Sequence, residues 1–233
     1  MEPKTNIDAA RQKAAAVVAA QRARERRRRV LLWSGGGVVA LAVVAGVVIG
    51  VNSGHPAADT TAGPSSAVSA SAGSTQAPPW AAPADASARA KAAGLSMLTA
   101  EGTAEHIHTH LSVSVEGKAV TVPAEVGIDE SAQLISPLHT HDTSGIVHVE
   151  SPVLKTFTLG EFFTEWDVAL SANRLGSYAT SDGYIITTFV NGKKAAGDPA
   201  AIALAGHEDV DIVISKGAAA ATAPAAFTWP AGY

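Results

Sequence analysis

Residues 106–115 read His106-Ile107-His108-Thr109-His110-Leu111-Ser112-Val113-Ser114-Val115, and polar and apolar side chains alternate along most of this stretch. Successive side chains of a β-strand point to opposite faces, so the aliphatic residues share one face and the histidines share the other. The sequence therefore predicts a half-buried strand. Glu116-Gly117 turns it back into residues 118–122 as a hairpin.

A second hairpin and a helix are predicted further along the chain. Residues 138–141 and 146–150 flank a turn-rich tetrapeptide, residues 142–145. Thr158 and Glu161 are spaced as a capping box, which predicts a helix that begins just after Thr158. The apolar residues that follow recur at the spacing of one helical face and are expected in the core: Leu159, Phe162, Phe163 and Trp166.

The remaining elements complete an α+β fold of β-hairpins packed on one main helix. Strands are predicted over residues 184–190 and 210–215, and Asn191-Gly192 is a strong turn signal after the first of them. From residue 138 onward this order is similar to that of the β-grasp (ubiquitin-like) fold. The hairpin over residues 103–122 would then be an N-terminal addition.

A membrane anchor is predicted before this domain. Residues 30–51 carry no charge, and 22 residues of helix are long enough to span a bilayer. Four arginines, residues 26–29, precede them and are expected to hold the N-terminus in the cytoplasm. The sequence thus predicts a single-pass protein of the cell membrane with an extracytoplasmic C-terminal domain. The alternative is a cleaved signal peptide, which the long basic segment and long apolar run disfavour.

Charge and composition divide the chain into five segments. Residues 1–29 have a net charge of +6 and the part after residue 51 a net charge of −10, although the whole chain has only −4. We interpret residues 1–29 as a cytoplasmic basic segment next to the bilayer, with no nucleic-acid partner. Residues 52–94 are rich in Ala, Ser, Gly and Pro and are expected to form a disordered tether. Residues 95–216 are the predicted folded domain and residues 217–233 a disordered tail.

Histidines are the feature most suited to chemistry. The chain has eight histidines and no cysteine, so imidazole and carboxylate are the available metal ligands. If residues 142–145 form the turn, His139 faces His148, and His139, His141 and His148 share one face with Glu150 beyond them. His106, His108 and His110 also share a face. Histidines two residues apart can converge on one ion, but the outer pair is about 13 Å apart, so this strand should supply two ligands or serve two sites.

These seven residues (His106, His108, His110, His139, His141, His148 and Glu150) are the predicted metal ligands. Three imidazoles with a carboxylate suit Zn²⁺ or Cu²⁺, and the lack of soft sulfur disfavours Cu⁺. Two other interpretations stay open, namely a buried hydrogen-bonded network and a pH-responsive surface.

Three segments resemble a family of uncharacterised, membrane-anchored, histidine-rich bacterial proteins that is common in actinobacteria. The segments are residues 106–111, 136–150 and 157–163, and the resemblance covers residues 104–215. It implies an extracytoplasmic domain that folds as one unit. It implies no mechanism, because the family has no established activity.

The sequence favours a membrane-anchored domain that buffers, senses or delivers Zn²⁺ or Cu²⁺ at the cell envelope. No Gly-x-Ser-x-Gly motif, phosphate-binding loop or dinucleotide fingerprint is present, which disfavours an enzyme. One alternative is nevertheless a metal-dependent enzyme in which Glu150 or Asp142 is a general base. Another is a non-catalytic adaptor with structural or pH-responsive histidines. The sequence identifies no protein partner.

Overall fold

A computed structural model describes residue 71, residues 73–217 and residues 221–233 of the chain. The predicted cytoplasmic segment and the predicted membrane span, residues 1–29 and 30–51, lie outside these residues and stay predictions. Within the described ranges, no helix is long and apolar enough to cross a membrane.

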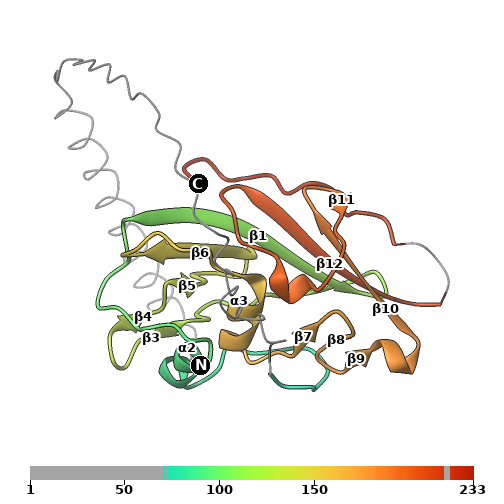
Figure 1. Cartoon of the computed structure of the whole chain (residues 1–233), viewed down its shortest axis with the longest axis horizontal. Coiled ribbons are helices and arrows are strands. Elements are labelled where there is room, and N and C mark those ends of the chain that lie inside the picture. Colours follow the sequence, from blue (N-terminus) through green and yellow to red (C-terminus); the bar gives the residue numbers. More distant parts are fainter. Residues whose placement is uncertain (1–70, 72, 218–220) are drawn as a thin grey trace, which may run out of the picture. The chain divides into compact units, whose positions relative to one another are not determined.

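The described residues form an α+β fold, as predicted, in which one large mixed sheet packs against helix α3 (Figure 1). The order of strands across the sheet is β11-β10-β12-β1-β6-β5, and β2 also pairs with β1. The bounds are β1 Glu105–Val115, β2 Lys118–Val120, β5 Leu138–His139, β6 Ile146–Ser151, β10 Tyr184–Val190, β11 Lys193–Lys194 and β12 Glu208–Lys216.

Shorter elements connect and cover this sheet. The helices are α2 Ala86–Ala92 and α3 Leu159–Glu165, with 3-10 turns η1 Thr180–Asp182 and η2 Pro199–Ala201. One small sheet contains β3 Ile128–Asp129 and β4 Leu134–Ile135. A second small sheet contains β7 Leu170–Ser171, β8 Arg174–Leu175 and β9 Tyr178–Ala179.

Strand β1 lies at the centre of the sheet, which corrects the prediction that its hairpin is an N-terminal addition. Its residues pair in parallel with β12 on one side and antiparallel with β6 on the other. The predicted strands and hairpins themselves are confirmed. The parallel pairing joins segments about a hundred residues apart, and no local pattern in the sequence encodes such a pairing.

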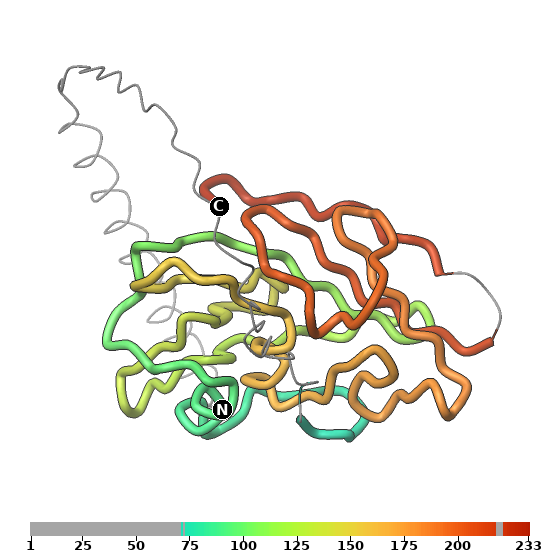
Figure 2. The backbone as a smooth tube through the Cα atoms, viewed as in Figure 1, coloured from blue at the N-terminus to red at the C-terminus, as the bar shows by residue number. Residues whose placement is uncertain are grey.

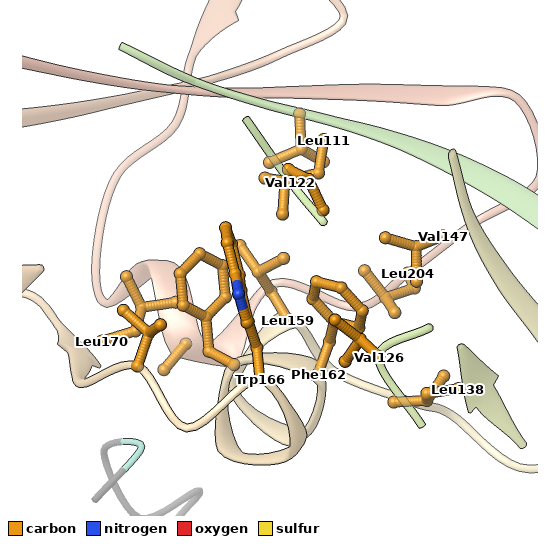
Figure 3. Packing of buried hydrophobic residues seen from close by; sticks show 14 of the residues in the cluster. Leu111, Val122, Val126, Leu138, Val147, Leu159, Phe162, Trp166, Leu170 and Leu204 are labelled. Atoms are coloured by element: carbon orange, nitrogen blue, oxygen red, sulfur yellow. The ribbon is translucent and has the colours of Figure 1, made fainter. Parts of the chain in front are cut away.

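Helix α3 covers one face of the sheet and fills the core. Thr158 Oγ1 accepts a hydrogen bond from the Glu161 backbone, and the Glu161 carboxylate accepts one from the Thr158 N–H, so the predicted capping box is confirmed. The four predicted core residues of this helix are at most 1% exposed. Figure 3 shows Phe162 and Trp166 packed between helix and sheet. The histidines of β1 lie on the opposite face.

The cap of α3 gives a first testable prediction. Replacing Thr158 with Ala removes the acceptor for the Glu161 N–H and should lower the free energy of unfolding by about 1 kcal/mol. Chemical denaturation of the full-length chain measures this change. Thr121→Ala, at an exposed position outside any helix, is the matched control and should leave stability nearly unchanged. Equal losses in both variants would contradict the role of the cap.

Part of the predicted tether belongs to the folded domain. Trp80 is 6% exposed, and its indole ring lies edge-on to that of Trp166, with 5.6 Å between ring centroids. Helix α2 follows, capped by Asp85, and Arg89 on it forms a 3.0 Å ion pair with Asp167. The averaged composition of residues 52–94 conceals the large apolar area that one tryptophan buries.

The C-terminal segment also differs from its predicted disorder. Residues 221–233, red in Figure 2, return along the sheet. The Phe227 ring stacks on His110 with centroids 3.7 Å apart, and the Tyr233 ring lies 4.9 Å from that of His108. Aromatic side chains in this Ala/Pro-rich tail therefore cover part of the histidine face.

Candidate metal centre

The pairing of β5 with β6 places two histidines side by side. His139 is directly opposite His148, which confirms the predicted register, and their rings stack with centroids 5.1 Å apart. Leu138 and Val149 form the neighbouring pair and point into the core. The alternation of the two strands therefore directs His139 and His148 to the face away from α3.

His139, His141 and His148 converge. One ring nitrogen of each lies within 4.8 Å of the others. The Nε2 atoms of His139 and His141 are 3.1 Å apart. Two ligands bound to one tetrahedral zinc ion at about 2.0–2.1 Å are about 3.3 Å apart, so this spacing suits a shared ion. We call these three residues the first triad.

Hydrogen bonds to neighbouring acceptors orient the buried members of the first triad. His139 is fully buried, and its Nδ1 donates to the carbonyl oxygen of Ser136 at 2.9 Å. This bond leaves the lone pair on Nε2, the atom nearest His141. The Nδ1 atom of His148 lies 3.1 Å from the Glu150 carboxylate. Such carbonyl and carboxylate partners are typical of histidines that bind metals.

A second group of candidate ligands lies on the adjacent parts of β1 and β6. It contains His106, His108 and Glu150, whose ligand atoms also lie within 4.8 Å of one another. Glu150 Oε1 is 3.4 Å from His106 Nε2 and 4.0 Å from His108 Nε2. We call these residues the second triad.

His110 is a predicted ligand that the structure places elsewhere. It belongs to none of the metal-compatible groups among the described residues. Its Nδ1 lies 2.6 Å from Asp209 Oδ1, and the same carboxylate accepts a hydrogen bond from the Phe227 N–H. His110 is therefore paired with a carboxylate beneath the C-terminal segment.

Burial keeps several of these imidazoles neutral. Desolvation and repulsion between neighbouring imidazoles lower the pKa of His148 to about 4 and that of His108 to about 3. The same causes hold the pKa of His139 well below its usual range. A neutral imidazole is the form that binds a metal ion, so these histidines need not lose a proton at neutral pH.

Two carboxylates that lie beside predicted ligands were not themselves predicted. Glu101 lies 3.7 Å from His141, and it forms a further metal-compatible group with His139 and Glu150. Burial and the nearby Glu150 raise the pKa of Glu101. Asp209 lies beside His110 because β1 pairs in parallel with β12, and it belongs to none of the metal-compatible groups among the described residues. Neither residue belongs to a recognisable motif, so spacing in the sequence gives no signal for them.

Comparison of the chain with known protein families, with curated proteins and with solved structures found no match. The function is therefore argued from the site itself.

Proposed function

We propose that the domain binds a divalent transition-metal ion, Zn²⁺ or Cu²⁺, through His139, His141 and His148. The convergence of three imidazole nitrogens is the observation that carries this proposal. The buried members of the triad have fixed tautomers, while His141 is exposed and gives an ion access from solvent. Three imidazoles with a vacant fourth position are a familiar zinc ligand set.

The proposed role is metal buffering, sensing or delivery on the outer side of the cell membrane. The uncharged run of residues 30–51 and the arginines before it support this location. We also infer that the sheet is a β-grasp variant, with β1 and β12 as its parallel central pair. Because one fold serves many functions, this inference does not bear on the metal.

Titration of the tag-free, full-length chain with Zn²⁺ and with Cu²⁺ in detergent micelles tests the proposal. His141→Ala removes a ligand whose side chain is 42% exposed, so the variant should fold normally. We expect it to weaken binding at the first triad by at least about 100-fold, since even the loss of a supporting hydrogen bond costs 10–100-fold. Isothermal titration calorimetry measures this change.

His207→Asn is the matched control. His207 is an exposed histidine of the same domain, and it belongs to no metal-compatible group in the described part of the chain. Asparagine tolerates its positive φ of 56°. The variant should bind as the wild type does. Equal affinity in His141→Ala and the wild type would contradict the proposal. It would favour the alternative in which the 3.1 Å contact between His139 and His141 is only an imidazole–imidazole hydrogen bond.

A further inference from the structure

We propose that the histidine face holds two metal ions, the second bound by His106, His108 and Glu150, with Glu150 linking the two sites. This inference deepens the proposed function, which concerns the first triad alone. The strand 106–110 carries more histidines than one ion can use, and the structure separates them between distinct positions.

Register arranges the ligands of both triads in two neighbouring rows across the sheet. His139 of β5, His148 of β6 and His108 of β1 are successive cross-strand partners and form one row. His106 of β1 and Glu150 of β6 are partners in the next row. Rows two residues apart are about 7 Å apart along a strand, and side chains from adjacent rows meet between them.

Glu150 is the group common to both sites. Its Oε1 accepts a hydrogen bond from His148 of the first triad at 3.1 Å. The same oxygen is 3.4 Å from His106 Nε2, close to the ligand separation expected around one tetrahedral zinc ion. The Glu150 side chain is 3% exposed, so this carboxylate has a fixed position. A carboxylate oxygen has lone pairs enough to support a ligand of one site and bind the ion of the other.

The charges around the face also suit two divalent ions. The six histidines of the face carry no negative charge, so only carboxylates can offset the positive charge of the two ions. Glu101 and Glu150 lie between and beside the triads, and Glu101 is 3.7 Å from His141. A bound cation would relieve the repulsion between these two carboxylates.

Each triad has one exposed ligand, which gives a clean test. His106 is 50% exposed at its side chain and belongs to the second triad, whereas His141 belongs to the first. The experiment measures Zn²⁺ bound per tag-free, full-length chain by equilibrium dialysis and metal analysis. We expect two ions in the wild type, one in His106→Ala, one in His141→Ala and none in the double variant. His207→Asn should retain two.

The outcomes separate this inference from the proposed function. One ion in the wild type, lost in His141→Ala and kept in His106→Ala, would overturn the second site and leave the first. One ion in the wild type, lost in His106→Ala and kept in His141→Ala, would overturn the first site and leave the second. Near-ultraviolet circular dichroism verifies that each variant is folded.

A substitution at Glu150 tests the link. Glu150→Gln keeps the size of the side chain but removes its charge, and should weaken binding of both ions by at least tenfold. Glu130→Gln, at an exposed carboxylate outside the metal-compatible groups, should bind two ions as the wild type does. A Glu150→Gln variant with unchanged affinity at both sites would overturn the role of Glu150.

Discussion

Zn²⁺ should raise the free energy of unfolding of the domain by about 4 kcal/mol when the free ion exceeds its Kd a thousandfold. The ligands of the first triad come from β5, β6 and the segment between them, and the folded sheet brings their nitrogens within 4.8 Å of one another. The unfolded chain does not hold this arrangement, so the ion binds the folded state more tightly. Chemical denaturation of the full-length chain at fixed free Zn²⁺ measures the shift.

His141→Ala shows whether this stabilisation comes from the first triad. Because the side chain is 42% exposed, the metal-free variant should unfold nearly as the wild type does. At the same Zn²⁺ concentration it should lose most of the stabilisation. An equal shift in the variant would contradict binding at the first triad, and lower stability with Zn²⁺ would mean that the ion prefers the unfolded chain.

Glu165→Gln should stabilise the domain at pH 8 by on the order of 4 kcal/mol relative to the wild type. Glu165, the last residue of α3, is 1% exposed, and burial raises its pKa to about 8. Neither carboxyl oxygen has a hydrogen-bond partner among the described residues, although nearby Ser136 and Arg89 oppose part of the increase in pKa. The carboxyl group is therefore mostly protonated in the folded protein at neutral pH.

Glu165→Gln is expected to be the more stable protein at high pH because burial raises the pKa of Glu165. Below the usual pKa of a glutamate, both folded and unfolded chains hold the proton, and wild type and variant should be equally stable. As the pH rises toward 8 the unfolded chain releases the proton first, so the wild type loses stability while the neutral amide of Glu165→Gln does not.

Urea denaturation of the metal-free chain between pH 4.5 and pH 8 measures the difference between the two proteins. Glu130→Gln replaces an exposed carboxyl group, and its stability should follow that of the wild type across this range. A difference between Glu165→Gln and the wild type that does not change with pH would contradict the protonated state of Glu165.

Local patterns predicted much of the fold and of the site. Alternation gave the faces of β1, and the turn at residues 142–145 set the register that places His139 opposite His148. The spacing of Thr158 and Glu161 located the start of α3. Each of these features depends on residues only a few positions apart. Within one strand, turn or helix, the regular backbone geometry fixes where such residues lie relative to one another.

Contacts between distant segments were not predictable in this way. The central position of β1, the packing of Trp80 on Trp166 and the stacking of Phe227 on His110 join residues far apart in the chain. Composition suggested disorder for both flanking segments, because averages over an Ala-rich stretch conceal single aromatic residues. Packing of those aromatic side chains against the domain offsets the entropy of ordering their segments.

The sequence by itself determined which candidate ligands this protein offers: imidazole and carboxylate without thiolate, on the polar face of alternating strands. Tertiary structure decided how those ligands are grouped. It placed His139, His141 and His148 in one triad and His106 and His108 with Glu150 in another, and it paired His110 with Asp209. The physical reason is that a strand fixes only the face on which a side chain lies. Its neighbours across the sheet depend on strand order and register, which only the packed fold sets.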